Sequence, residues 1–304
     1  MSKTVSPKIS VVIPLYNKGA YIAATLQSVL RQTFPSFEVI IVDDGSTDQG
    51  PAVVETFQDS RLRIVHQSNL GVSAARNQGI RLAQAPYIAF LDADDFWQPT
   101  YLEEMLRFIE RYPACGLYVS AHQVAEKHQV LDPPKDLPEG VLPDYFHAEL
   151  TYKITRLSST VVPRQICEEV GGFPVGMVSG EDSYFCGRIA IAHPVAFLTK
   201  PLVIYNQQYS GLQDRSFKGD TCAEDWCDLY QPGAFYQNEL VAVKALKAGI
   251  RLAMTLNRSQ SRAIEKRTRY TALFQKKWRY LYFLNRVPAP FILLYKKIKP
   301  LLAN

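Results

Sequence analysis

Three carboxylates lie directly after a short apolar segment in the first third of the chain. Asp92, Asp94 and Asp95 occur in the sequence FLDADDFW, and the residues before them, Tyr87–Leu91, predict a buried strand. Carboxylates so close together repel one another unless a cation neutralises them, and hard divalent cations prefer oxygen ligands. The motif therefore predicts a metal site that handles a phosphate or pyrophosphate. A solvated acidic turn that caps the next helix is the alternative.

Two other apolar segments also end in residues that could bind a ligand. Asp43 and Asp44 follow Glu38–Val42, where a carboxylate can accept hydrogen bonds from a nucleobase or a ribose hydroxyl. Helix capping is the alternative for these acids. Tyr16 follows Ile9–Ile13, and its ring could stack on a nucleobase or simply pack against the protein.

Arg76 and Asp182 are candidates on two further segments. Gly71–Asn77 begins a predicted helix whose first amides favour an anion. Within it, Arg76 could reach a phosphate or pair with an acid. Asp182 follows the glycine-containing segment Gly176–Gly180 and could act as a general base. The alternative is that Asp182 and Glu181 only favour the N-terminus of a helix.

These residues must be positioned by strands that alternate with helices. That order predicts right-handed βαβ units and an α/β fold with a mostly parallel central sheet flanked by helices. Ligands bind such sheets at the carboxyl ends of the strands, where the candidate acids fall. The predicted strands are Ile9–Ile13, Glu38–Val42, Leu62–His66, Tyr87–Leu91 and Leu117–Gln123. The predicted helices are Ala20–Arg31, Thr47–Phe57, Gly71–Ala83, Pro99–Arg111, Glu181–Ala192 and Glu239–Leu256.

The charge is divided unevenly along the chain. Residues 235–304 hold 15 Lys and Arg against 2 acids, whereas residues 1–234 hold 19 against 27. This split predicts an acidic catalytic domain over 1–234 and a basic helical tail over 235–304 that binds an anionic surface. Within the domain, residues 1–100 are expected to bind the nucleotide, and residues 101–234 to supply the acceptor side and the base.

The tail combines basic residues with aromatic ones. Such segments suit the interface of an anionic membrane; the alternative is that the aromatic residues pack on the domain and the lysines are solvated. A nucleic acid is not expected as a partner, because the basic residues are interleaved with Ile, Leu and Phe. The predicted helical face consists of Tyr270, Phe274, Trp278 and Leu281, with Lys276, Lys277 and Arg279 among them.

Several sequence features predict a cytoplasmic protein, peripheral on the inner face of the cytoplasmic membrane. The N-terminus has no pattern of an export signal. No apolar stretch reaches the roughly 18 residues that span a bilayer. The 5 cysteines are scattered, which favours reduced thiols. Cys222 and Cys227 have no second pair, so zinc is not expected.

Two long segments strongly resemble the inverting family 2 glycosyltransferases with a GT-A fold. They read ISVVIPLYNKGAYIAATLQSVLRQTFPSFEVIIVDDGSTD and GVSAARNQGIRLAQAPYIAFLDADDFWQP. The similarity is dense over Ile9–Pro99 and continues more sparsely through Gly171-Gly172-Phe173 and Glu181-Asp182 to about Ser210. The resemblance implies a nucleotide-sugar donor, usually one carrying UDP, and a Mn²⁺ or Mg²⁺ cofactor.

The resemblance also implies how the donor is bound. By their positions in the motifs, Pro14 and Tyr16 would hold the uracil. Asp44 would hydrogen-bond the base, with Asp43 nearby. Arg76 would approach the pyrophosphate.

The remaining residues carried over by the resemblance concern the metal and the reaction. Asp92 would contact the ribose or a metal-bound water, and Asp94 would ligate the metal. Asp182 would be the general base of a single displacement that inverts the anomeric centre. The metal would neutralise charge on the departing nucleoside diphosphate.

Two departures from the family pattern matter. The Gln-x-x-Arg-Trp motif of processive members is absent, which favours the addition of one sugar per encounter. The pattern Tyr-Arg-x-His is replaced by Tyr205-Asn206-Gln207-Gln208. Gln208 therefore stands where a histidine could assist metal or phosphate binding, and strict metal dependence is not implied.

The expected function is transfer of one sugar from a nucleotide sugar to a glycan of the bacterial cell-surface type, with a lipid-linked glycan as one form of acceptor. A nucleotidyltransferase is a rival, although the chain has no glycine-rich triphosphate loop. A non-catalytic module that binds a nucleotide sugar, or that is anchored to a membrane, is the second rival. The presence of Asp94 and Asp182 argues against this last option.

Overall fold

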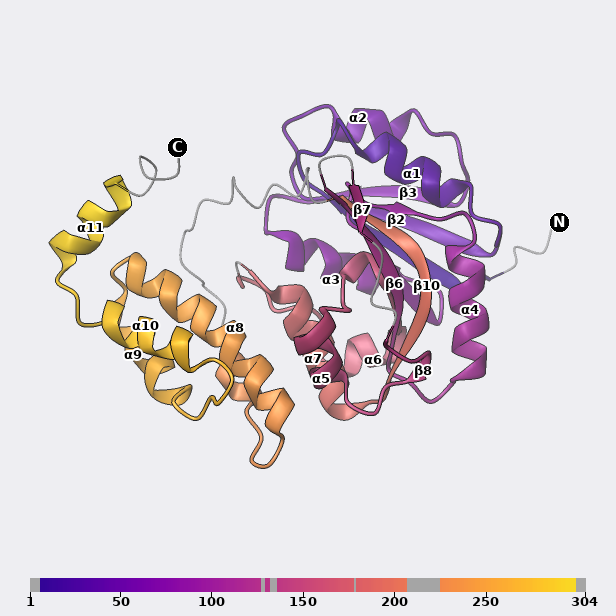
Figure 1. Cartoon of the computed structure of the whole chain (residues 1–304). Helices are drawn as coiled ribbons and strands as arrows, with labels where there is room; N and C mark the ends of the chain where they lie inside the picture. The colour runs from indigo at the N-terminus through magenta and orange to yellow at the C-terminus, as the bar shows by residue number, and fades with distance from the viewer. Residues whose placement is uncertain (1–5, 127–128, 132–135, 178, 207–224, 299–304) are drawn as a thin grey trace. The chain divides into compact units, whose positions relative to one another are not determined.

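The computed structural model describes residues 6–126, 129–131, 136–177, 179–206 and 225–298. The chain forms two compact units, Met1–Thr221 and Cys222–Asn304. The first unit contains a sheet covered by helices, and the second is helical (Figure 1).

Four parallel strands form the N-terminal half of the sheet, in the order β3-β2-β1-β4. Leu15 at the end of β1 lies opposite Asp43 at the end of β2. The carboxyl ends of these strands therefore meet at one edge, as predicted. Their bounds are β1 Ile9–Leu15, β2 Phe37–Asp43, β3 Leu62–His66 and β4 Tyr87–Phe90.

The rest of the sheet is mixed. Strand β9 is antiparallel to both β4 and β6, whereas β10 is parallel to β6. Strand β5 pairs antiparallel with β10, which brings Trp97 opposite Val203. This pairing places the chain that follows the acidic motif beside the end of β10. The bounds are β5 Phe96–Trp97, β6 Leu117–Glu126, β7 Gln129–Leu131, β8 Gly140–Val141, β9 Thr160–Pro163 and β10 Val195–Asn206.

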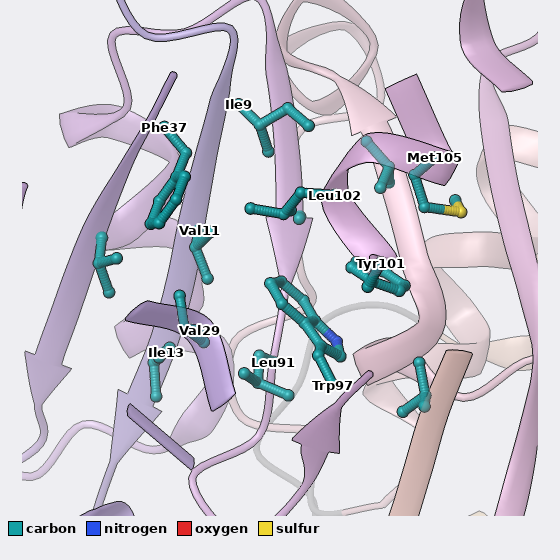
Figure 2. Close-up of a cluster of buried hydrophobic side chains, with 14 of the residues drawn as sticks. Ile9, Val11, Ile13, Val29, Phe37, Leu91, Trp97, Tyr101, Leu102 and Met105 are labelled. Atoms are coloured by element: carbon teal, nitrogen blue, oxygen red, sulfur yellow. The ribbon is translucent and has the colours of Figure 1, made fainter. Parts of the chain in front are cut away.

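Alternating side chains of the sheet face two separate cores. Val11 and Ile13 pack with α1 and α4 on one face, where Trp97 stacks on Tyr101 with ring centroids 4.2 Å apart (Figure 2). Val12 and its neighbours pack with α3, α5, α6 and α7 on the other face. The helices are α1 Ile22–Leu30, α2 Gly50–Glu55, α3 Val72–Leu82, α4 Tyr101–Arg111, α5 Tyr145–Tyr152, α6 Arg164–Glu169 and α7 Glu181–Ala192, with the short helix η1 at Leu157–Ser159.

The predicted α/β fold, with a central sheet flanked by helices and a C-terminal helical region, is confirmed. Asn17 is of a residue type that often caps helices, but it does not cap α1, which begins at Ile22. Asn17 has a left-handed φ of 51°, and its side chain instead accepts a hydrogen bond from the amide of Thr47 at 2.8 Å. It therefore links the loops that follow β1 and β2.

In its described residues, 225–298, the second unit consists mainly of four helices. Gly249 lets α8 approach its neighbours closely, because a Cβ there would lie 2.9 Å from Leu281 and 3.0 Å from Ile264. The carboxylate of Glu239 accepts hydrogen bonds from the amides of Ala272 and Leu273, which follow α9. The elements are η3 Trp226–Leu229, α8 Phe235–Met254, α9 Arg258–Arg267, α10 Gln275–Leu284 and α11 Ala289–Ile298.

The single aromatic face predicted for Tyr270–Leu281 is wrong, because a turn separates α9 from α10. Tyr270 precedes α10, and its hydroxyl donates to the carbonyl of Asn238 at 3.1 Å. Trp278 donates to the carbonyl of Glu265 at 2.8 Å, and Leu281 is fully buried. These side chains stabilise the helical unit itself. Within the described part of the chain, no helix has the length and apolarity needed to cross a membrane.

Candidate active site

The acidic motif forms a tight turn at the end of β4. The amide of Asp95 donates to the carbonyl of Asp92 at 3.1 Å. Asp94 is almost buried, and one of its oxygens lies 2.6 Å from the Lys18 ammonium. Burial raises the pKa of Asp94, and the charge of Asp92 raises it further, against the effect of Lys18. The carboxylates of Asp92 and Asp94 therefore lie close enough at this turn for one to affect the pKa of the other.

Asp95 has a different environment from the other two acids. It is 1 % exposed, and it accepts hydrogen bonds from the Ser158 hydroxyl and from the Asn206 amide, the latter at 2.9 Å. The Ser158 Oγ also accepts from the amide of Asp92 at 3.1 Å. Burial raises the pKa of Asp95 well above its ordinary value, and Asp92 adds to the effect. Asp95 thus holds η1 and the end of β10 against the acidic turn.

Arg76 joins the acidic motif to α7. Its guanidinium lies 2.7 Å from Asp92 and 3.2 Å from Glu181, and the residue is 4 % exposed. Burial lowers the pKa of Arg76, but the two carboxylates outweigh this effect and the pKa is raised. Of the two roles considered for Arg76, pairing with an acid is the one seen in this structure. Contact with a pyrophosphate stays a prediction.

The candidate base lies in the first turn of α7, which begins at Glu181. Gly180 precedes this helix with a φ of 90°, a conformation that suits glycine. Asp182 accepts a hydrogen bond from the Ser183 amide at 2.6 Å, and its charge contributes to the raised pKa of Arg76. The pair Glu181 and Asp182 therefore occupies a helix N-terminus and also lies beside the acidic motif, although it is remote from that motif in the sequence.

Asp43 and Asp44 both make hydrogen bonds within the protein. Asp44 accepts from the Gln67 side chain and from the amides of Leu70 and Gly71, over 2.7–2.9 Å. Asp43 accepts from the Ser46 amide, and its Oδ2 lies 3.0 Å from His66 Nδ1. Burial raises the pKa of Asp43, but these hydrogen bonds outweigh the effect of burial, and the pKa is lowered overall. Contact of either acid with a base stays a prediction.

Tyr16 and Pro14 lie at the carboxyl end of β1, beside the loops that carry the acids. Tyr16 is 47 % exposed, so much of its ring is accessible to a planar ligand. Its expected stacking on uracil, with Pro14 nearby, stays a prediction.

The donor set of the acidic turn fits a hard divalent cation. Mg²⁺ commonly binds one or two carboxylates together with substrate phosphates, and the carboxylates of Asp92 and Asp94 are close enough for the charge of Asp92 to raise the pKa of Asp94, after the larger effect of burial. The Lys18 ammonium supplies positive charge beside Asp94. No group of three or more His, Cys, Asp or Glu residues suited to a metal occurs among the described residues. Gln208, Cys222 and the segment around them lie outside the described residues.

Three residues of this site were not identified from the sequence. Lys18, Ser158 and Asn206 contact the acidic turn from loops and strand ends far away in the chain. The only local signal was the excess of carboxylates, which requires hydrogen-bond donors or cations from elsewhere.

Comparison with known proteins agrees with this fold. The profile of "Glycosyl transferase family 2" matches residues 10–156. EpsH of Bacillus subtilis, described as a glycosyltransferase, is 42% identical over 253 residues, which cover 77% of this chain and 70% of EpsH. The chain therefore belongs to glycosyl transferase family 2 and is a glycosyltransferase.

A second relative and a solved structure extend the comparison. TuaG of Bacillus subtilis, described as a glycosyltransferase of teichuronic acid biosynthesis, is 36% identical over 141 residues, covering 45% of this chain and 56% of TuaG. The crystal structure of S. aureus TarS 1-349 in complex with UDP-GlcNAc superimposes with a TM-score of 0.61 and 23% identity, over 90% of this chain and 79% of that chain. This likeness identifies the GT-A fold.

Proposed function

We propose that the protein transfers one sugar from a UDP-sugar to a glycan acceptor by an inverting single displacement. The observation that supports the proposal is the chain of ion pairs Asp92–Arg76–Glu181, because it links the acidic turn to the residue that directly precedes Asp182. The complex of TarS with UDP-GlcNAc supports UDP as the nucleotide.

In this mechanism, side chains of the first unit bind and orient the donor and the acceptor, and one of them accepts a proton. The carboxylate of Asp182 accepts the proton of the acceptor hydroxyl as its oxygen attacks the anomeric carbon. Asp94, with Asp92 nearby, would hold a Mn²⁺ or Mg²⁺ ion, which would supply positive charge to neutralise the departing nucleoside diphosphate. Attack opposite the leaving group inverts the anomeric centre.

Binding of the nucleotide is assigned to the edge formed by β1, β2 and β4. Tyr16 stacks on the uracil beside Pro14, and Asp44, with Asp43 nearby, recognises the base. This assignment requires Asp44 to exchange one of its hydrogen bonds to Gln67–Gly71 for one to the base. Arg76, held by Asp92, approaches the pyrophosphate.

Nucleotide titration tests the donor site. Binding of UDP, GDP, CDP and dTDP is measured with and without Mn²⁺ on wild type, Asp94→Ala and the surface control Glu168→Ala. UDP-selective binding that requires Mn²⁺ and is lost only in Asp94→Ala is expected. Absence of nucleotide binding by the wild type would contradict the proposal and leave a non-catalytic, tail-anchored module as the better account. Inversion is read from the anomeric configuration of the product by NMR.

We also assign residues 235–304 a role at an anionic membrane, on the inner face of the cytoplasmic membrane, next to a lipid-linked acceptor. On α10, the residues Lys276, Arg279, Tyr280 and Phe283 recur at helical spacing and are all exposed. Phe283 is 62 % exposed, and Phe291 on α11 is 64 % exposed. Aromatic and basic side chains on one helix face suit a lipid headgroup region.

Vesicle flotation tests this role in the full chain. Phe283→Glu is expected to reduce binding to vesicles containing anionic phosphatidylglycerol, whereas neutral phosphatidylcholine vesicles bind weakly in either case. Leu273→Glu is the matched control, because Leu273 is 55 % exposed but lies outside α10 and α11. Equal binding by wild type and Phe283→Glu would refute the role of this face.

A further inference from the structure

Arg156 is a cation whose charge has no carboxylate partner among the described residues. Its Nη1 donates to the carbonyl of the adjacent Thr155 at 3.2 Å and to no other group in the described part of the chain. Its Nε is buried without a hydrogen-bond acceptor in the described part of the chain. Buried donors of this kind usually have a partner, so the Nε–H of Arg156 is a candidate donor to a bound ligand.

His122 and Tyr205 lie with Arg156 on one side of the sheet. In the parallel pair β6–β10, His122 is opposite Val203. Tyr205 lies two residues after Val203 on β10, so the side chains of His122 and Tyr205 are on the same face of the sheet. The Arg156 guanidinium lies over the Tyr205 ring, 5.1 Å from its centroid. The Nδ1 of His122 is also buried without a described partner.

The electrostatics describe a fixed positive charge beside a neutral donor. Burial lowers the pKa of His122 to about 4, and the charge of Arg156 lowers it as well. His122 is therefore neutral near pH 7 and can supply a hydrogen bond, while Arg156 supplies the charge. This combination suits an anionic oxygen, because guanidinium forms strong, directed hydrogen bonds to phosphate and carboxylate groups.

The cluster is adjacent to the acidic turn. Arg156 directly precedes η1, whose Ser158 contacts both Asp92 and Asp95. Tyr205 directly precedes Asn206, whose amide donates to Asp95. The charges of Asp92, Asp94 and Asp95 all act on Tyr205, together with that of Arg156. An anion bound at Arg156 would thus lie close to the proposed donor site.

We propose that Arg156 and His122 form an anion subsite that binds a phosphate or carboxylate oxygen of the substrate. The proposal rests on the function assigned above, and it separates the tasks of two arginines. Arg76 is 4 % exposed and already paired with two carboxylates, whereas Arg156 is half-buried and lacks such a pair among the described residues. Arg156 can therefore bind an anion without breaking an ion pair.

Two sources of the anion are compatible with this chemistry, namely the diphosphate of the donor and a carboxylate on the transferred sugar. Calorimetric titrations of UDP, uridine, inorganic pyrophosphate, UDP-glucose and UDP-glucuronate distinguish them. They compare wild type, Arg156→Gln, Arg156→Lys, His122→Asn and the control Arg164→Gln, a half-exposed arginine on α6. Circular dichroism and thermal unfolding verify that each variant is folded.

If the subsite binds the diphosphate, Arg156→Gln should weaken the binding of UDP and pyrophosphate about tenfold, or about 1.4 kcal/mol. The binding of uridine should be unchanged. A sugar carboxylate predicts unchanged UDP binding and a loss of about tenfold in the preference for UDP-glucuronate over UDP-glucose. Arg156→Lys should restore part of either effect, and His122→Asn should reproduce part of it.

Two negative results have different meanings. If wild type binds UDP and Arg156→Gln binds all five probes within twofold of it, the subsite is refuted and the proposed function survives. If wild type binds no nucleotide, the proposed function fails. Pyrophosphate then decides the subsite alone: binding that is lost in Arg156→Gln supports it, and no binding by wild type overturns it.

Discussion

The side chain of Asp95 accepts a hydrogen bond from the backbone amide of Asn206, with the two atoms 2.9 Å apart and the residues 111 positions apart in the chain. Asp95 also accepts from Ser158. The three acids of the motif therefore have separate tasks. Asp92 and Asp94 pair with the cations Arg76 and Lys18, while Asp95 holds the end of β10 in position.

Replacement of Asp95 by alanine is expected to destabilise the first unit by about 3 kcal/mol, because it leaves a buried hydroxyl and a buried amide without their acceptor. Urea unfolding measures this loss. Asp59→Ala is the control, since Asp59 pairs only with the nearby Arg61 at a more exposed site. A loss below about 1 kcal/mol would show that Asp95 does not hold β10.

Replacement of Arg76 by glutamine is expected to cost about 3 kcal/mol or more, because removing one partner of a buried ion pair leaves an uncompensated charge. Glu181 is the more affected partner, since its side chain is 6% exposed against 34% for Asp92. The double variant Arg76→Gln/Glu181→Gln should recover part of the stability in a double-mutant cycle. Additive losses would contradict coupling between the two residues.

Lys18 is expected to compete with a divalent cation for Asp94, because its ammonium lies 2.6 Å from a carboxylate oxygen. Lys18→Gln should therefore bind Mn²⁺ several-fold more tightly than wild type in the absence of nucleotide. The exposed Lys8→Gln is the control. Calorimetric titration measures the affinity for Mn²⁺. Weaker Mn²⁺ binding by Lys18→Gln than by wild type would contradict the competition and mean that Lys18 favours metal binding.

Asp182→Asn is expected to lower the turnover number by about 10²–10⁴-fold, the range typical of a general base, without weakening the binding of UDP. Amide and carboxylate have nearly the same size, so the first turn of α7 should persist. Product formation and nucleotide titration are measured on the same preparation, with Glu168→Gln as the control. Turnover within about threefold of wild type would place the general base elsewhere.

The lowered pKa of Asp43 predicts that the stability of the fold depends on pH. Its folded pKa lies below the ordinary value, so its carboxylate stabilises the fold above the unfolded pKa of about 3.8. That contribution disappears as the pH falls through the lowered folded pKa. Asp43→Asn should therefore be about 1 kcal/mol less stable than wild type at pH 7, with the difference shrinking towards pH 3. A constant difference across this range, from urea unfolding, would contradict the assignment.

The sequence predicts most of the N-terminal half of the sheet because its strands are continuous apolar runs. Strand β3 has the predicted bounds, and β1 and β2 each extend by two residues or fewer at one or both ends. Strand β10 was not predicted, because Thr199, Lys200 and Pro201 interrupt its apolar pattern where the pairing with β6 is irregular.

The candidate site was predictable in residue types but not in partners. Clustered carboxylates indicated a need for positive charge, yet nothing local specified that Lys18 or Arg76 would supply it. In the tail, the spacing of Tyr270 and Trp278 suggested one exposed face. The turn held by Glu239 breaks that face, and the aromatic side chains that remain exposed on α10 are Tyr280, Tyr282 and Phe283.

The two ion pairs of Arg76 have consequences for the order in which the protein is assembled during translation. Arg76 and Asp92 are 16 residues apart, whereas Arg76 and Glu181 are 105 residues apart. A nascent chain can therefore form the first pair long before the second, and domains generally fold as the N-terminal part emerges first. Until α7 has left the ribosome, the guanidinium has only one of its two carboxylates. Glu181 and the neighbouring candidate base Asp182 can therefore join Arg76 only after the segment that carries Arg76 and Asp92 has been synthesised.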